Sequence, residues 1–138
     1  MTATEPAVPV APLGRSAARA WVAYTTILTM AVFLQAVTAG RLLDGDSWAR
    51  DVHRTVAGLL VIAAFVGGLV AVVRLRDRAG GRRFGLLLVA IGVGLVLQYG
   101  LGIAAAHGNG TLWIHVPLGV AIVGLTMRLN VFARRWKP

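Results

Sequence analysis

Residues 97–119 read LQYGLGIAAAHGNGTLWIHVPLG, and residues 34–58 read LQAVTAGRLLDGDSWARDVHRTVAG. In both stretches a Leu-Gln pair stands near the end of an apolar run, and a polar loop then leads to a histidine that begins the next apolar run. Gln35 precedes His53 by 18 residues, and Gln98 precedes His115 by 17. The chain therefore contains a duplicated unit in which the two histidines occupy equivalent positions.

A small residue follows each of these polar residues after four positions. Ala39 and Gly102 follow the glutamines, and Ala57 and Gly119 follow the histidines. Residues four apart lie one turn away on nearly the same face of a helix. Each small side chain is therefore expected beside its polar neighbour, where it either makes room for a bound group or permits ordinary helix packing.

Around this repeat the composition is that of a membrane protein. The 138 residues are 57% hydrophobic and only 14% charged, well outside the range of soluble domains. Four apolar runs, about 20–40, 52–73, 84–106 and 112–132, each reach the roughly 20 helical residues that cross a hydrocarbon core. The prediction is an all-α integral membrane four-helix bundle embedded in the lipid bilayer and spanning residues 15–138.

The N-terminal segment is set apart from this domain. Residues 1–14 contain Pro6, Pro9 and Pro12 and lack an apolar face, which predicts a disordered cytoplasmic tail. An alternative interpretation takes the first run as a signal peptide cleaved after Val37-Thr38-Ala39. The run is longer than the apolar part of most signal peptides, and cleavage would remove Gln35 from the repeat, so a retained span is favoured.

Basic residues predict the orientation, because Lys and Arg resist translocation. Arg15 and Arg19 before the first run, the 74–83 loop and the C-terminal end from Arg128 onward together hold 11 of them, whereas the residues around the two opposite loops hold 3. Both termini are therefore expected in the cytoplasm, and the histidines at the extracytoplasmic side of the plasma membrane, with Trp48 and Trp113 at the interface. The net charge of +9 is explained by this topology, so nucleic-acid binding is not expected.

Each repeat contains two spans, so both copies enter the membrane in the same sense, as parallel repeats related by an axis along the membrane normal. Short loops make consecutive spans neighbours. Close helix contact in lipid favours small residues. Glycines that fit this role lie in the second and third spans: Gly58, Gly67, Gly68, Gly85, Gly92 and Gly94.

The repeat axis points the two imidazoles toward each other, which predicts a flat apolar cofactor with two axial positions. Imidazole is a common axial ligand of haem iron, so His53 and His115 are the predicted metal ligands of a haem b. The absence of cysteine excludes covalently attached c-type haem, iron–sulfur clusters, thiolate metal sites and disulfides. A single interfacial histidine would more often bind water or lipid headgroups, and that alternative stays open for each residue.

Other polar residues could support such a site. Gln35 and Gln98 have three possible partners: an imidazole N–H, a haem propionate or a neighbouring helix. Arg54, together with Arg41 and Arg50, suits propionates, or else neutralises the loop acids Asp44, Asp46 and Asp51. His107 has no repeat counterpart and is expected to be exposed, with a minor alternative role as a proton carrier or ligand. Pro117 is expected in the first turn of its helix.

Catalytic machinery is harder to assemble from this sequence. The four apolar runs contain no acidic residue, so a dinuclear or carboxylate-bridged metal site lacks ligands. The Gly-X-Gly spacings in the third span follow no strand and are therefore not nucleotide-binding loops. No nucleophile and base stand out as a pair. No catalytic residue is predicted.

The repeated pattern Leu-Gln-x3-small, outer loop, His-x3-small resembles one four-helix half of the haem A synthase family over about residues 30–125. The matching positions are Gln35 through Gly40, His53-Arg54, Gln98 through Gly102, and His115. The resemblance implies paired histidine ligands on the second and fourth spans, with haem between them at the extracytoplasmic side. Small uncharacterised four-span membrane proteins of related architecture look similar at the same positions.

This chain departs from that family in two ways. It has half the family's length, and Ala49, four residues before His53, stands where the catalytic half carries a Glu. The better analogy is therefore the half that only holds a haem.

Three hypotheses follow. The first is a b-type haem protein for electron transfer, acting alone or as the partner of a redox enzyme. The second is a cofactor-free subunit for membrane assembly or interaction. The third is a homodimeric enzyme similar to haem A synthase.

Overall fold

The computed structural model describes residues 13–136, and they form four long helices. These are α1 (Arg15–Leu43), α2 (Ser47–Arg74), α3 (Gly81–Ala106) and α4 (Leu112–Ala133), followed by the short 3-10 helix η1 (Arg134–Trp136). All four are long and apolar enough to cross a membrane, so the predicted all-α fold with four long apolar helices is confirmed. The predicted tail lies outside the described residues except for Leu13 and Gly14.

The helices extend past the apolar runs, because apolarity follows the membrane whereas helical hydrogen bonding continues into charged flanks. The polar loop predicted at 41–52 is thus largely helical, and only Asp44–Asp46 forms a turn, with Gly45 at φ +95°. Leu75 lies in the 74–83 segment that the sequence marks as a basic loop, yet it packs into the core at 2% exposure. Pro117 also differs from expectation: it lies inside α4, one turn beyond the helix start at Leu112.

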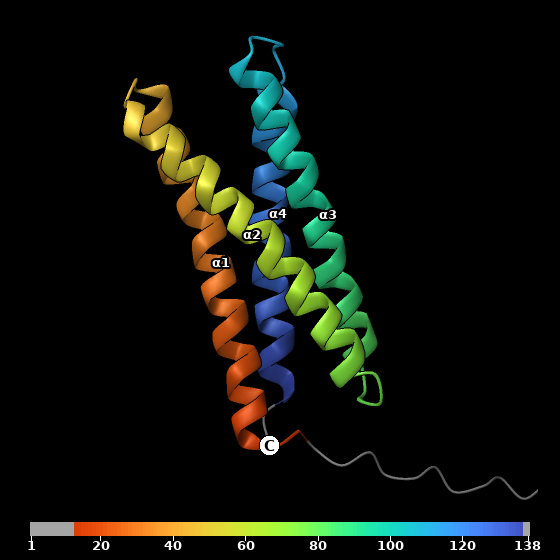
Figure 1. Cartoon of the computed structure of the whole chain (residues 1–138). Coiled ribbons are helices and arrows are strands. Elements are labelled where there is room, and N and C mark those ends of the chain that lie inside the picture. Colours follow the sequence, from red (N-terminus) through yellow and green to blue (C-terminus); the bar gives the residue numbers. More distant parts are fainter. Residues whose placement is uncertain (1–12, 137–138) are drawn as a thin grey trace, which may run out of the picture.

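The four helices form a closed ring of neighbours. α1 contacts α2 and α4, and α3 contacts the same two helices, so within residues 13–136 the pairs α1/α3 and α2/α4 are diagonal. Figure 1 shows the start of α1 and the end of the chain at one end of the bundle, and the α1–α2 and α3–α4 turns at the other. The hairpin α1–α2 and the hairpin α3–α4 separate toward the second end.

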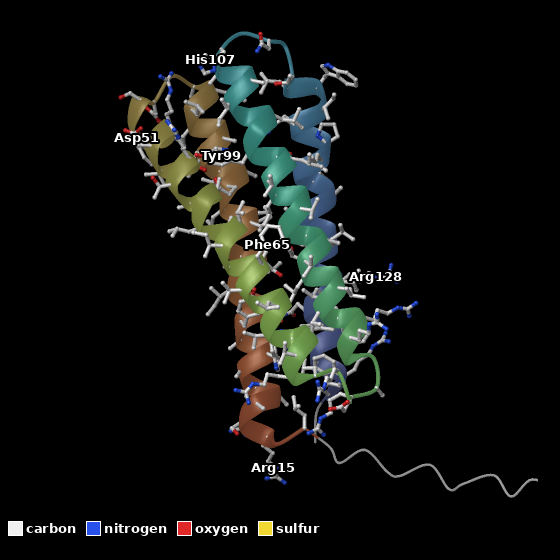
Figure 2. The ribbon with its side chains drawn as sticks, turned by 45° about the vertical axis from the view of Figure 1, so that its right-hand side comes forward. Arg15, Asp51, Phe65, Tyr99, His107 and Arg128 are labelled. Carbon is white, nitrogen blue, oxygen red and sulfur yellow. The ribbon has the colours of Figure 1, made fainter. Side chains whose placement is uncertain are left out.

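The two ends also differ in their residues, and we name them accordingly. The histidine end holds the turns 44–46 and 107–111, and the arginine end holds the 75–80 turn and both described chain termini. Figure 2 shows Asp51, Tyr99 and His107 toward the histidine end and Arg15 at the arginine end. The exposed Trp48 and Trp113 lie at the histidine end, as expected for interfacial aromatic residues.

The helices α2 and α3 approach most closely at glycines in the half of the bundle nearer the arginine end. A Cβ atom at Gly85 would lie 2.6 Å from the backbone nitrogen of Val72, and one at Gly68 would lie 3.0 Å from that of Val89. These positions exclude any side chain, in agreement with the predicted small-residue contact. Gly58 differs, because a Cβ there would meet nothing within 4 Å.

A packed core fills that same half. Phe84 is fully buried, and its ring meets Trp21 and Trp136 edge-on at centroid separations of 5.4 and 4.8 Å. Asn130 of α4 adds a polar contact to α1, donating to the hydroxyls of Thr25 at 2.9 Å and Thr26 at 2.8 Å. Aromatic packing and this side-chain amide thus hold the arginine end together.

The core stops at one level of the bundle, marked by Val32, Leu60, Leu95 and Ile122. Toward the histidine end, among the described residues, only Ala49 is buried. The polar residues of the repeat therefore lie in a half whose side chains are partly exposed and whose two hairpins diverge.

Candidate functional site

The two repeat histidines lie near each other across the bundle. His53 is in the second turn of α2 and His115 is in the first turn of α4, on diagonally opposed helices. Their ring centroids are 6.4 Å apart, the ring planes are inclined by 56°, and both side chains are half-buried. The structure thus brings together two residues that are 62 positions apart in the chain.

Both glutamines form the same hydrogen bond within their own hairpin. The Gln35 amide nitrogen donates to the backbone carbonyl of His53 at 3.2 Å, and the Gln98 amide donates to that of His115 at 2.7 Å. Of the three predicted types of partner, the structure gives both amides a neighbouring helix. Each bond locks the helix turn that carries a histidine against the preceding helix.

The imidazole of His115 is oriented by the backbone of α3. Its Nδ1 lies 3.0 Å from the carbonyl oxygen of Gln98, which can only accept, so Nδ1 carries the proton. The neutral ring then has its lone pair on Nε2. Among the described residues Nε2 has no hydrogen-bond partner, so the atom that could bind a metal is available.

His53 is oriented by a side chain, and the contact favours the same tautomer as in His115. Its Nδ1 lies 2.9 Å from the hydroxyl of Thr38, and that hydroxyl lies 3.0 Å from the carbonyl oxygen of Gln35. A hydroxyl that donates its single hydrogen to a carbonyl accepts from its other neighbour. The Nδ1 of His53 is then the donor, and its Nε2 holds the lone pair, as in His115.

The small residues of the second hairpin accommodate its polar side chains. A Cβ atom at Gly102 would lie 3.1 Å from Cε1 of His115, and one at Gly119 would lie 2.9 Å from the amide nitrogen of Gln98. Each polar side chain therefore packs against the glycine of the opposite helix. The equivalent Ala39 and Ala57 of the first hairpin are half-buried.

Two of the arginines near the histidine end, Arg54 and Arg41, have partners within the protein. Arg54 Nε donates to the Tyr99 hydroxyl at 3.3 Å and so links α2 to α3 at an exposed position. Arg41 pairs with Asp46 at 2.6 Å across the first turn, which is the neutralising role that the sequence allowed.

The remaining sequence candidates lie apart from the histidine pair. His107 is exposed, as expected, and its Nδ1 lies 2.8 Å from the carbonyl of Ile103, beside the end of α3. Ala49, one turn before His53, has no exposed surface, so a larger side chain there would displace its neighbours. Neither residue adds a third donor to the pair.

Thr38 and Tyr99 were missed by the sequence reasoning. Thr38 lies three residues after Gln35, on the same helix face, and Tyr99 directly follows Gln98. These offsets were visible in the sequence, but the residues of α2 that they meet depend on how the helices cross.

Comparison with family models, with curated proteins and with solved structures finds no match to this chain. The resemblance to half of a haem A synthase therefore stays a prediction. The function must be inferred from the geometry around His53 and His115.

Proposed function

We propose that this protein binds one b-type haem between His53 and His115. The observation that carries the proposal is the matched state of the two imidazoles. Each ring has Nδ1 hydrogen-bonded within its own hairpin and Nε2 available. Metal-binding histidines almost always have this arrangement, because the outer hydrogen bond fixes the tautomer and raises the basicity of the ligand.

The spacing of the rings supports a shared metal ion. Two imidazoles on opposite sides of one ion, with bonds of about 2 Å and ring centres roughly 1 Å beyond the nitrogens, would have centroids about 6 Å apart. The centroids of His53 and His115 are 6.4 Å apart. The two rings are thus at a separation that needs little rearrangement for joint coordination.

The donor set favours haem over a bare ion. Within residues 13–136 no group of three or more His, Cys, Asp or Glu side chains comes together, so the protein offers two donors at this place. A structural zinc ion needs four ligands. Haem would itself supply most of the ligands of its iron, so the two donors His53 and His115 would suffice to hold it.

The surrounding residues would bind and orient the group. Gln35 and Gln98 hold the histidine-bearing turns, and a ring bound between the histidines would lie beyond the last buried core residues, Val32, Leu60, Leu95 and Ile122. Arg54 is exposed beside the pair and could exchange Tyr99 for a propionate. When bound, haem supplies one-electron redox chemistry, so electron transfer requires no catalytic side chain.

The proposal includes a topology. The parallel two-helix repeat, with both termini in the cytoplasm, would put the haem near the outer face of the plasma membrane. There it could exchange electrons with an extracytoplasmic partner or with a redox enzyme in the membrane. The concentration of arginines at the end opposite the histidines supports this orientation.

One observation favours the second candidate, a cofactor-free assembly subunit. The Gln-to-His bonds close each hairpin without any bound group, so a purely structural role would also explain the repeat. Enzymatic activity as a homodimer has no comparable support from the described residues and stays a prediction from the family resemblance.

An absorption spectrum separates the two candidates. The full chain is produced in cells supplied with excess haem and purified in mild detergent, and a Soret band at one haem per chain is expected. His53→Ala or His115→Ala should abolish the six-coordinate spectrum, whereas His107→Ala is the matched control that should leave it unchanged. A colourless protein with full helical content would overturn the proposal and favour the assembly subunit.

A further inference from the structure

The two histidines are held by different kinds of acceptor. His115 bonds directly to the carbonyl of Gln98, whereas His53 bonds to the Thr38 hydroxyl, which in turn bonds to the carbonyl of Gln35. The equivalent of Thr38 in the second repeat is Leu101, which has no polar atom in its side chain. A hydroxyl is therefore inserted between histidine and backbone in the first repeat alone.

A threonine that bonds back to its own helix is common in membrane helices and needs no functional explanation. Thr29 of α1 does so, with its hydroxyl 2.7 Å from the carbonyl of Thr25. Thr38 differs because it also meets a side chain of another helix, the Nδ1 of His53 at 2.9 Å. Its hydroxyl lies 3.3 Å from the Gln35 side-chain oxygen as well, so two of its three polar neighbours are oxygens of Gln35 that only accept.

This arrangement makes the hydroxyl directional. Because both of its other neighbours are oxygens that only accept, the Thr38 proton is directed toward Gln35, and the Thr38 lone pair toward His53. The neutral His53 ring must then donate from Nδ1. In the opposite tautomer the Thr38 hydroxyl would have to donate to His53 Nδ1, and its lone pairs would then face both Gln35 oxygens.

We propose that Thr38 is a positioning residue for His53, which selects the tautomer with Nε2 free and orients that atom toward His115. The expected effect of Thr38 on haem binding rests on the proposed function. Its expected effect on the His53 tautomer does not. One ligand position thus depends on a replaceable side chain, and the other on the backbone.

The first test needs no haem. The full chain, labelled with ¹⁵N at its three histidines, is studied by NMR in detergent at a pH where imidazole is neutral, with signals assigned through single histidine variants. The His53 signals should show a protonated Nδ1. Thr38→Val should shift His53 toward the other tautomer, whereas Thr38→Ser should keep the original one. Thr29→Val, on the same helix, should leave His53 unchanged.

An unchanged His53 tautomer in Thr38→Val, or a wild-type His53 protonated at Nε2, would overturn the inference. If Thr38→Val loses helical content, Thr38→Ala gives the same readout. In haem titrations, Thr38→Val should bind about 10-fold more weakly or worse, which is the usual range for losing an outer-shell partner. Equal affinity in Thr38→Val and wild type would also count against it. A wild-type chain that binds no haem would overturn the proposed function while leaving the tautomer test valid.

Discussion

The two halves of the bundle are built on opposite principles. Near the arginine end, glycines let α2 and α3 touch, aromatic rings surround Phe84, and side chains such as Leu88 are fully buried. Near the histidine end Ala49 is the only buried residue among those that the structure describes, and polar groups make contacts between the helices. Stability and the candidate site are thus separated along the helix axes, so substitutions in one half should spare the property of the other.

Loss of a core aromatic should have the largest effect on stability. Phe84→Ala removes a ring with no exposed surface, and Phe→Ala changes in cores cost about 3–5 kcal/mol. Phe33→Ala is the matched control, because that ring is 52% exposed and lies toward the histidine end. Thermal unfolding followed by circular dichroism in detergent measures both. Equal destabilisation by the two variants would contradict the division of the bundle.

Added methyl groups should distinguish the halves by their packing. Gly85→Ala forces α2 and α3 apart and should cost about 1–3 kcal/mol, as overpacking does. Gly58→Ala adds the same atom in the other half, where nothing lies within 4 Å, and should be neutral or slightly stabilising. The same melting experiment applies. A strongly destabilised Gly58→Ala would show that the histidine end packs more tightly than described.

Side-chain amides occur in both halves and allow a direct comparison. Asn130→Leu removes the α1–α4 bonds, and Gln98→Leu removes the bond to the His115 carbonyl. Hydrogen bonds between membrane helices contribute about 0.6 kcal/mol on average, so both changes in stability should be small. Haem titration should separate them, with a loss of affinity only in Gln98→Leu. Weakened haem binding in Asn130→Leu would show that haem binding depends on contacts in both halves.

The smallest effect on stability is expected at the exposed link between the hairpins. Tyr99→Phe removes the 3.3 Å bond from Arg54 and should change the free energy of unfolding by about 0.5 kcal/mol or less, because the link is open to solvent. Arg54→Gln should be equally mild for stability but should weaken haem binding, since the arginine is the expected propionate partner. If Arg54→Gln binds haem as tightly as the wild type does, the role of Arg54 is limited to its hydrogen bond with Tyr99.

The sequence predicted the parts of this structure that depend on repetition and apolarity. The four apolar runs lie in four helices. The repeat identified His53 and His115, and in the fold their ring centroids are 6.4 Å apart. Helix ends were placed less well, because an apolar run reports the thickness of the membrane rather than the length of the helix. Leu75 illustrates this point: it lies among arginines in the chain but folds back into the core.

Contacts between side chains of different helices were the least predictable. Thr38 reads as one more threonine in an apolar run until the crossing of α1 and α2 places His53 beside it. Likewise, Gly119 looked suited to clear space for a bound ring, but its position is explained by the Gln98 amide that packs on it. Such pairings depend on the register between helices, which a single sequence does not contain.

The glutamine bonds have a consequence for biogenesis. Every hydrogen bond that orients His53 lies between α1 and α2, and every one that orients His115 lies between α3 and α4. Each hairpin can therefore form the hydrogen bonds that orient its own histidine before it meets the other hairpin. The distance between the two rings is set only when the hairpins dock through the glycines and aromatic residues at the arginine end. Capture of a ligand by both histidines would then act as a checkpoint, since it can occur only in chains whose distant end has already assembled.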